Sequence, residues 1–432
     1  MRGGSIPAIP LPQVDPLPET SPPPESVEDS PPLAMPLSLH GLEFSLDTAS
    51  LDALEAVARR VTRTQVGSWF SDFQGSEEVA LLSTCHRVEL ALLVRSPGEV
   101  NRWREVLPGD PESWNLREGQ PVVRHFFRVA AGRESLAVGE AEVREQVRLA
   151  GSFVATRHPR RVLRDLMAAA AGAAEKVRPA VPSSVSIAAI ASRRLLDTLE
   201  HPRPRILVLG SGVVGRQVAE ALAPFARVTL VFHHRPPEEA FLLSTGVRAV
   251  PFAELVTELP TAQAVVTAAK LGDHSLRRSD VPTDHPVTLV DLGVPRNIDP
   301  GVRDMKNVKL IDLEELHARS RSLPEADGSD SRLEELASHF YERIEPLLLE
   351  PWIAALRRAA EEVRQSEVAR SRRFLGELGP AQEAALERLT QRLVTRLLLA
   401  PTERIRGLPP GPEGDLQRRI AIDLLCPRSA DP

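Results

Sequence analysis

The sequence predicts a multidomain α/β protein with an α+β domain, a Rossmann-type domain and a C-terminal helical region. Short apolar strands alternate with helical periods over residues 37–182, and an apolar strand runs into a glycine-rich loop and a helix at 205–223. After residue 315, apolar positions recur at helical spacing. The 432 residues are enough for two or three cores, and we expect domains at 37–182, 183–314 and 315–432.

The first 36 residues are rich in proline and acidic side chains and contain no aromatic residue. Such a segment buries too little apolar surface to offset the entropy lost on ordering. We therefore expect residues 1–36 to form a disordered, solvated extension, with binding of a partner through polyproline II turns as the alternative. Met35 stands just before the strand-like run LSLHGLEF, so the folded protein is expected to begin there, and Met35 is a candidate start of translation.

Cysteine content and hydropathy indicate the cellular compartment in which the protein is expected. The two cysteines, Cys85 and Cys426, form no CxxC motif, so neither a disulfide framework nor a structural zinc site is expected. No uncharged run approaches the ~18 residues of a membrane helix, and no secretory signal precedes the folded region. We expect a cytoplasmic protein without a membrane partner, and the net charge of −6 does not favour DNA binding.

The run RILVLGSGVVGRQVAEALA carries a dinucleotide-binding pattern, because a strand leads into GxGxxG and then a helix. The helix N-terminus supplies amide donors for a pyrophosphate. Further strands of a parallel sheet are expected at RVTLVF, AVVTAA and VTLVDLGV. The alternative is a glycine turn without a nucleotide. The predicted cofactor-binding residues of this loop are Gly210, Ser211, Gly212, Val213, Val214 and Gly215.

The end of the second strand favours NADPH over NADH. NAD sites usually carry an acidic residue there, whereas this chain reads Phe232-His233-His234-Arg235. Arg235 can hold a 2′-phosphate by charge-assisted hydrogen bonds. A metal on the two histidines is not expected, because adjacent side chains at a strand end point apart and no third ligand is evident.

Cys85 lies in the run EEVALLSTCHRVELALLV, between two apolar strand-like segments. A thiolate can attack an acyl carbonyl, and the resulting thioester can accept a hydride from a nicotinamide. The neighbouring Arg87 can hold a substrate carboxylate and favour the thiolate. An inert, buried cysteine is the alternative on local grounds.

Two further regions shape the expected domain arrangement. The run PAVPSSVS interrupts a helical pattern, so we expect a hinge at residues 179–184. The C-terminal region is expected to form a spine and a bundle that associates with another copy, with Pro346 and Pro351 bending or interrupting the spine. A solvated helix face, or alternatively a basic face for phosphates, is expected from Arg370, Arg372, Arg373, Arg388, Arg392 and Arg396.

Several blocks in series resemble the glutamyl-tRNA reductase family, which catalyses the first step of the five-carbon (C5) route to tetrapyrroles such as haem. The blocks are LLSTCHRVEL, RHFFRVAAGRESLAVGEAEVREQV, EKVRPAVPSSVSIA, VLGSGVVG and LVDLGVPRNIDPGVRDMKNVKLIDLEEL. The resemblance implies NADPH-dependent reduction of glutamyl-tRNA(Glu) to glutamate-1-semialdehyde through a cysteine thioester. It also implies a V-shaped homodimer joined through the C-terminal helices, and passage of the product to an aminomutase.

The resemblance assigns roles residue by residue. Cys85 matches the nucleophile and His125 the active-site histidine. The substrate-binding positions are Ser83, Thr84, His86, Arg87, Ser135, Glu140 and Gln146, with Gly139 in the same helical block. The glycine loop and Arg235 match the family's cofactor-binding positions.

This chain departs from the family pattern at several places. His86 replaces the asparagine that follows the nucleophile, and can still donate a hydrogen bond to the substrate. GLEFSLDTASLDALEAV replaces the N-terminal H-x-T-A-P-x-x-x-R-E motif, GRES replaces G-L-D-S, and AEV replaces P-Q-I. Two alternatives therefore stay open: a non-catalytic or regulatory paralogue that keeps the fold, and an NADP reductase acting on another acyl substrate.

Overall fold

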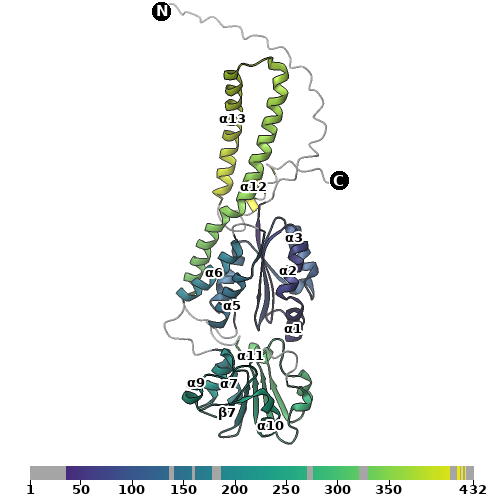
Figure 1. The fold of residues 1–432 in the computed structure, drawn as a ribbon, viewed down its shortest axis with the longest axis vertical. Coiled ribbons are helices and arrows are strands. Elements are labelled where there is room, and N and C mark those ends of the chain that lie inside the picture. The colour runs from purple at the N-terminus through teal and green to yellow at the C-terminus, as the bar shows by residue number, and fades with distance from the viewer. Residues whose placement is uncertain are drawn as a thin grey trace, which may run out of the picture.

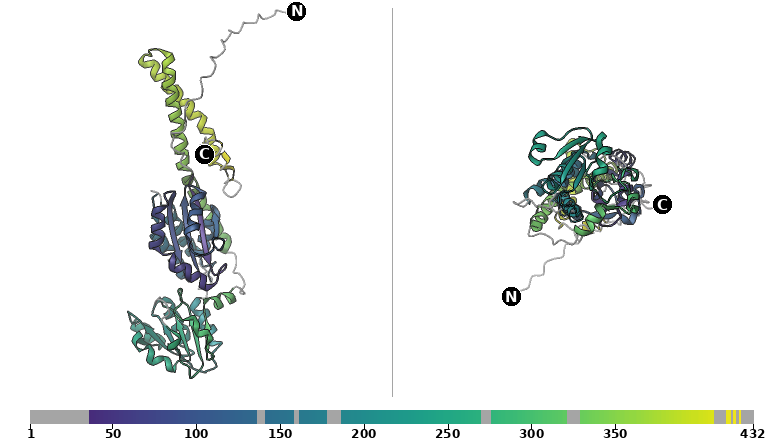
Figure 2. Two further views of the ribbon diagram at one scale, coloured as in Figure 1. Left: turned by 90° about the vertical axis from the view of Figure 1, so that its right-hand side faces the viewer. Right: turned by 90° about the horizontal axis from the view of Figure 1, so that it is seen from below.

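A computed structural model describes residues 36–135, 141–157, 161–177, 186–269, 276–320, 329–408, 416–418, 420, 421 and 424. The expected N-terminal extension, the expected hinge at 179–184, and the positions Gly139, Glu140 and Cys426 lie outside the described residues. The described part is elongated, with a parallel-sheet domain at one end, an antiparallel-sheet domain in the middle and a helical hairpin at the other end (Figure 1). A perpendicular view shows the same order (Figure 2).

The middle domain is built on a five-stranded antiparallel sheet in the order β4-β1-β3-β2-β5. Its strands are β1 (Ser38–Ser45), β2 (Ser76–Ser83), β3 (Arg87–Val94), β4 (Asn115–Glu118) and β5 (Ala155–Thr156). Every residue of the central strand β3 is buried, because helices cover both faces of the sheet. Leu90 packs on one face and Ala91 on the other, as the two-residue period of a strand requires.

One face of this sheet is covered by α1 (Leu51–Arg60), α2 (Arg63–Asp72) and α3 (Pro97–Val106). The other is covered by α4 (Gln120–Ala130), α5 (Ala141–Ser152) and α6 (Val162–Lys176). Local signals start several of these helices. The Ser50 and Thr62 side chains accept hydrogen bonds from the backbone N–H groups of Ala53 and Gln65, which caps α1 and α2.

The second domain is a six-stranded parallel sheet in the order β11-β10-β9-β6-β7-β8. Counted from β6, the strand order is 3-2-1-4-5-6, which is the Rossmann arrangement. The strands are β6 (Arg205–Leu209), β7 (Arg227–Phe232), β8 (Arg248–Pro251), β9 (Ala264–Thr267), β10 (Val287–Asp291) and β11 (Val308–Ile311). The predicted multidomain α/β fold with a Rossmann-type domain is confirmed.

Helices of this domain include α7 (Ile187–Leu196), α8 (Val213–Leu222), α9 (Glu239–Thr245), α10 (Leu255–Glu258) and α11 (Leu313–Ser320). Helix α8 follows the glycine-rich loop, and α7 packs against it. Helix α11 follows β11 and lies between the two sheet domains (Figure 1).

The C-terminal region consists of α12 (Ser329–Leu375) and α13 (Pro380–Arg406). Helix α12 is continuous through Pro346 and Pro351, so the interruption, one of the two effects expected of these prolines, is not observed. Its first half packs on the middle domain and its second half packs on α13, through Leu333, Phe340 and Ile344 and then through Trp352, Ile353 and Leu356. The packing of both halves of the helix against neighbours stabilises it on either side of the two prolines.

Exposed apolar side chains follow one line along α13: Leu389, Leu393 and Leu397. This four-residue spacing places them on one face of the helix. The arginines of the same region are not a purely basic surface, because Arg370 and Arg372 lie 3.8 and 3.6 Å from the carboxylates of Glu367 and Glu383. Across the described residues, no helix combines the length and the apolar character needed to cross a membrane.

Candidate active site

Cys85 sits in the tight connection between β2 and β3, at the end of the central hairpin. The last paired residues are Ser83 and Val88, and the N–H of Thr84 donates to the carbonyl of Arg87 at 2.9 Å. Inside the turn the Thr84 hydroxyl accepts from the N–H of His86 at 3.1 Å. The carbonyl of His86 accepts from the N–H of Leu46 just beyond β1, at 3.0 Å. These bonds fix the backbone on either side of a half-buried thiol.

The thiol contacts the side chain of the next residue. Cys85 Sγ lies 3.0 Å from His86 Nδ1. The imidazole is 5% exposed, and its Nε2 has no hydrogen-bond partner among the residues that the structure describes. Burial, followed by the charges of Arg87 and His317, lowers the pKa of His86 to about 3, although Asp47 opposes the shift. His86 is therefore neutral at physiological pH.

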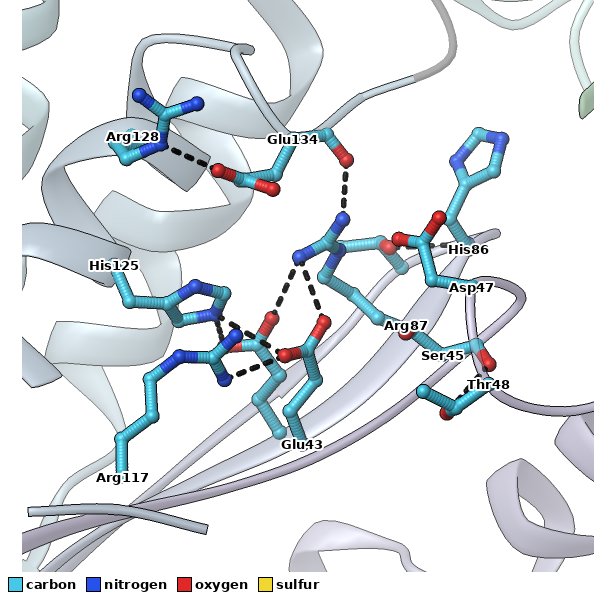
Figure 3. A network of polar contacts seen from close by, with 12 residues as sticks. Glu43, Ser45, Asp47, Thr48, His86, Arg87, Arg117, His125, Arg128 and Glu134 are labelled. Atoms are coloured by element: carbon cyan, nitrogen blue, oxygen red, sulfur yellow. Dashed lines mark hydrogen bonds and ion pairs between the residues drawn. The ribbon is translucent and has the colours of Figure 1, made fainter. Parts of the chain in front are cut away.

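Arg87 is the centre of a buried network of charges (Figure 3). Its Nη1 donates to Glu43 Oε1 at 3.2 Å and to Glu89 Oε1 at 3.1 Å, and its Nη2 donates to the carbonyl of Glu134. The second oxygen of Glu43 accepts from Arg117 Nη1 at 2.6 Å. Burial alone would lower the pKa of Arg87, but the two carboxylates raise it. The guanidinium is thus charged and already bound to acidic side chains.

His125, on α4, joins the same network. Its Nε2 lies 3.0 Å from Glu89 Oε2 and 3.9 Å from Glu43 Oε2. Burial would raise the pKa of Glu89, yet His125 and Arg87 bring it down to about 2. Glu89 is therefore ionised, and it fixes the orientation of the His125 ring.

Three groups in this network have the chemistry of metal ligands. The ligand atoms of Glu43, Glu89 and His125 all lie within 4.8 Å of one another, and all three side chains are buried. However, Arg87 and Arg117 already bind these carboxylates and balance their charge. The cluster offers a cation little net attraction, so a hydrogen-bonded network fits these residues better than a metal site.

The glycine-rich loop has the shape that a dinucleotide requires. Gly210 has φ +117°, and a Cβ there would lie 2.8 Å from the carbonyl oxygen of Ala268. A Cβ on Gly215 would lie 1.9 Å from the carbonyl oxygen of Gly210. In contrast, Gly212, at the N-cap of α8, faces open space. The first and third glycines are needed for the turn, and the second leaves room for a phosphate at the helix N-terminus.

The exposed residues at the end of β7 lie beside this loop. The Ser211 hydroxyl donates to the carbonyl of Arg235 at 3.1 Å, which joins the loop to the predicted 2′-phosphate site. The expectation that His233 and His234 point apart is wrong, because their ring centroids are 4.3 Å apart. Both residues follow the last residue of β7, so the alternation of a strand no longer applies to them.

Polar contacts join the middle domain to the Rossmann domain, and one of them lies beside the Cys85 turn. Arg296, after β10, binds both oxygens of Glu55 on α1, at 3.0 and 2.9 Å. Gln217, on α8, donates to Glu142 on α5 at 3.3 Å. His317, on α11, lies 3.2 Å from Asp47, and its ring centroid is 6.2 Å from that of His86. The residue next to Cys85 therefore lies against the dinucleotide-binding domain.

Comparison with known proteins agrees with this arrangement. Residues 42–181 match the family "Glutamyl-tRNAGlu reductase, N-terminal domain", residues 191–318 match "Shikimate / quinate 5-dehydrogenase", and residues 331–424 match "Glutamyl-tRNAGlu reductase, dimerisation domain". The glutamyl-tRNA reductase of Rubrobacter xylanophilus is 30% identical over 362 residues, which cover 77% of this chain and 83% of that protein. The chain belongs to the glutamyl-tRNA reductase family.

Two further known proteins are similar to this chain. The glutamyl-tRNA reductase of Salinispora arenicola is 29% identical over 408 residues, covering 88% of this chain and 87% of that protein. The solved glutamyl-tRNA reductase of Methanopyrus kandleri aligns with a TM-score of 0.48 and 25% identity, over 90% of this chain and 97% of that chain. The predicted family is confirmed. As a member of the glutamyl-tRNA reductase family with a dehydrogenase-like domain, the chain is an oxidoreductase with a nicotinamide cofactor.

The structure brings some of the residues predicted from the reductase pattern together. Thr84, Cys85, His86 and Arg87 share one turn, and His125 reaches the same cluster through Glu89. Ser83 is exposed at the end of β2. Ser135 follows Glu134, whose carbonyl binds Arg87.

Gln146 is half-buried on α5, and its Oε1 has no hydrogen-bond partner within the described part of the chain. No direct contact within that part joins Gln146 to the Arg87 network, and the roles of all these residues in the reductase stay predictions.

Sequence reasoning missed three members of the reductase cluster: Glu43, Glu89 and Arg117. Glu89 follows Arg87 by two residues on one strand, so a period of two places both on the same face. Glu43 reaches the cluster because Ser45 pairs with Arg87 in the β1–β3 register. Arg117 depends on the pairing of the distant strand β4 with β1, for which the sequence carries no local signal.

Proposed function

We propose that this chain reduces the glutamyl ester of tRNA(Glu) to glutamate-1-semialdehyde, with NADPH as reductant, in the C5 route to tetrapyrroles. The observation that carries the proposal is the position of the Cys85 turn. A half-buried thiol lies at the end of a fixed hairpin, and its neighbour His86 lies against α11 of the dinucleotide-binding domain. A nucleophile and a nucleotide site on facing domains are what reduction of an acyl group through a thioester needs.

In the proposed mechanism, the Cys85 thiolate attacks the carbonyl carbon of the glutamyl ester. The ester C–O bond breaks, and the 3′ ribose oxygen leaves with a proton from His125 or water. NADPH, when held at the glycine-rich loop, would supply the hydride that the thioester carbonyl carbon accepts. The C–S bond then breaks, Cys85 leaves as a thiolate, and the aldehyde is released. Without NADPH, water hydrolyses the thioester to glutamate.

Other residues of the turn and the network would bind and orient the substrate. Thr84, whose hydroxyl shapes the turn, lies beside the thiol, and Arg87 is the cation nearest to Cys85 in sequence. Glu89 holds the His125 ring in one orientation. His125 can therefore deliver a proton to the leaving ribose oxygen from a fixed position. Ser83, Ser135, Glu140 and Gln146 are proposed as further pocket residues from the reductase pattern alone.

The choice of NADPH rests on the end of β7. Arg235 is exposed next to the Ser211 hydroxyl, and no acidic residue stands among Phe232, His233 and His234 to bond ribose hydroxyls. A guanidinium there binds a 2′-phosphate more strongly than a ribose hydroxyl. Gly212, with open space at the α8 N-terminus, would receive the pyrophosphate.

The proposed assembly is a homodimer through α12 and α13. The dimerisation-domain match covers residues 331–424, and Leu389, Leu393 and Leu397 are exposed on one face of α13. A stripe of this kind is usually covered by a partner. An aminomutase that takes up the aldehyde is a further proposed partner, on the resemblance alone.

One observation favours the alternative of a non-catalytic paralogue. Arg87, the expected ligand of the substrate carboxylate, already binds Glu43 and Glu89. The experiment must therefore separate binding of the tRNA from chemistry at Cys85.

The test is a single-turnover assay with glutamyl-tRNA carrying labelled glutamate, with and without NADPH, beside a Cys85→Ser control. Semialdehyde that requires both NADPH and Cys85, and labelled glutamate without NADPH, are the expected results. An active Cys85→Ser protein would overturn the mechanism. Bound tRNA with neither thioester nor aldehyde would instead support the non-catalytic paralogue.

A further inference from the structure

The side chain that contacts Cys85 is a departure from the family pattern, which carries asparagine where His86 stands. The sequence alone suggested that His86 replaces this asparagine as a ligand of the substrate. The structure instead points the imidazole at the thiol, with 3.0 Å between Nδ1 and Sγ. In Figure 3 the ring points away from the Arg87 network, where a substrate carboxylate is expected.

We propose that His86 stabilises the Cys85 thiolate as a neutral hydrogen-bond donor, through its Nδ1–H group. Asparagine and histidine share the geometry that this role needs. The amide nitrogen of asparagine and Nδ1 of histidine are each bonded directly to Cγ, so both place an N–H group at the same number of bonds from the backbone. Histidine can therefore keep the donor of the family pattern while changing the rest of the side chain.

The surroundings of the ring oppose a charged imidazole. His86 is 5% exposed, and the neighbours that disfavour a positive charge on its ring are Arg87 on β3 and His317 on α11. Asp47, after β1, is the acidic group that faces it, and it is itself 3.2 Å from His317. The balance keeps His86 neutral, so the thiol proton leaves to solvent and His86 does not take it as a general base.

The two ring nitrogens differ in a way that selects the tautomer. Nδ1 faces sulfur, whereas Nε2 is buried with no partner among the described residues. A proton on Nε2 would be an unpaired buried donor, and orphaned buried N–H groups are rarer than orphaned acceptors. In the Nδ1–H tautomer the N–H group donates to Cys85 Sγ, and only the lone pair of Nε2 has no partner among the described residues. Loss of the thiol proton then makes the N–H···S bond charge-assisted, which strengthens it.

The inference rests on the proposed function only for the identity of Cys85 as nucleophile, because ionisation of the thiol can be measured without tRNA. A hydrogen bond to a charged group changes an equilibrium constant by roughly ten- to a hundredfold, and a tenfold change corresponds to one pH unit. Removing the donor should therefore raise the ionisation midpoint of Cys85 by about one to two pH units.

The experiment uses the Cys426→Ser background, which leaves Cys85 as the one cysteine of the chain. The rate of iodoacetamide alkylation is measured from pH 5 to 10 for this protein and for its His86→Ala and His86→Asn variants. Circular dichroism confirms that each variant is folded. We expect a single ionisation in the parent, an upward shift of about one to two units in His86→Ala, and rescue in His86→Asn, which restores a donor.

Three results would overturn the proposal. The midpoint could be unchanged in His86→Ala, or His86→Asn could shift as far as His86→Ala. As a third possibility, the alkylation rate could stay high down to acidic pH and fall only at a second ionisation. That profile would indicate a thiolate–imidazolium pair instead of a neutral donor.

A measurement on the unmodified protein covers the case in which His86→Ala does not fold. In protein labelled with ¹⁵N-histidine, His86 should show the Nδ1–H tautomer between pH 6 and 8, and an imidazolium or the Nε2–H tautomer would contradict the inference. Failure of aldehyde synthesis with an intact alkylation profile would count against the proposed function alone.

Discussion

Arg87 Nη1 donates to Glu43 Oε1 at 3.2 Å, so the guanidinium expected to receive the substrate's carboxylate already holds a carboxylate of the chain. Glu89 takes a second bond from the same nitrogen, at 3.1 Å. If Arg87 is to bind the glutamyl side chain, an oxygen of the substrate must replace one of these bonds. Glu43 is the one that can be lost, because without Arg87 it still pairs with the cation of Arg117 at 2.6 Å, whereas Glu89 would keep only His125.

We predict that Glu43→Gln lowers the KM for glutamyl-tRNA. The amide removes the competing charge, and a charged hydrogen bond is worth about 1.5–3 kcal/mol, so the decrease should be on the order of tenfold. The measurement is steady-state aldehyde formation at varied glutamyl-tRNA. Glu77→Gln is the matched control, since it removes a buried carboxylate bound to Arg95 at 2.6 Å, far along the sheet from Cys85. An unchanged or higher KM in Glu43→Gln alone would show that Glu43 does not compete with substrate.

The contact of Arg296 with α1 leads to a second prediction, on domain closure. Arg296 donates to Asp52 and to both oxygens of Glu55, so Arg296→Gln should loosen the Rossmann domain from the middle domain. Acylation of Cys85 needs only the middle domain, whereas reduction needs both. We expect glutamate release without NADPH to continue at its normal rate, while aldehyde formation falls at least about tenfold, the loss typical of a misplaced reactant.

The two quantities to compare are the single-turnover rates of glutamate release without NADPH and of aldehyde formation with NADPH. A control variant for this comparison lies within the Rossmann domain. Arg303→Gln removes an ion pair with Asp312 inside that domain and should leave the ratio of the two rates as it is. A parallel loss of both activities in Arg296→Gln would show that the contact supports folding and not closure.

The order of domains, the Rossmann topology and the glycine turn could be predicted from sequence, because each depends on local patterns. The strand that ends at Leu209 and the helix that begins at Val213 are close in the chain, and glycines between them indicate a backbone that other residues rarely adopt. The hairpin around Cys85 was visible for the same reason, as two apolar segments with a polar connection. The continuity of α12 through Pro346 could not be predicted from the sequence, because it depends on packing against residues distant in the chain.

The charge network around Arg87 shows the limit of local patterns. Its members come from β1, β3, β4 and α4, and the contacts Glu43–Arg87 and Glu43–Arg117 join residues 44 and 74 positions apart. Nothing near Glu43 marks it as an ion-pair partner, and only the β1–β3 register sets it beside the arginine. Likewise, the position of His86 was clear from sequence, but the direction of its ring was not.

Cofactor preference gives a third prediction. Arg235→Gln should raise the KM for NADPH by about ten- to hundredfold, because a charge-assisted bond to the 2′-phosphate is lost, and should change the KM for NADH little. Arg227→Gln, at the exposed opposite end of β7, is the matched control. The ratio of kcat/KM for the two nucleotides is the quantity to measure. If Arg235→Gln keeps the preference for NADPH, the 2′-phosphate is bound by other residues.

The buried, neutral state of His86 leads to a fourth prediction, on the pH dependence of stability. The pKa of His86 is about 3 in the folded protein, against an ordinary value of 6.5. Below pH 6.5 the unfolded chain therefore binds a proton that the folded protein does not, and stability falls as pH falls through this range. The loss is about 1.4 kcal/mol per pH unit, or about 2 kcal/mol between pH 6.5 and 5.

The measurement compares free energies of unfolding by urea at pH 7, 6 and 5 for the parent protein and His86→Asn, which has no titrating ring. Glu78 affects the free energy of unfolding in the opposite direction. Burial raises its pKa to about 6, so its protonation stabilises the folded protein increasingly as pH falls. Because Glu78 is present in both proteins, its effect cancels in the difference. The difference curve should decline by about 2 kcal/mol toward pH 5. A flat difference curve for His86→Asn would mean that the folded protein protonates His86 as readily as the unfolded chain does.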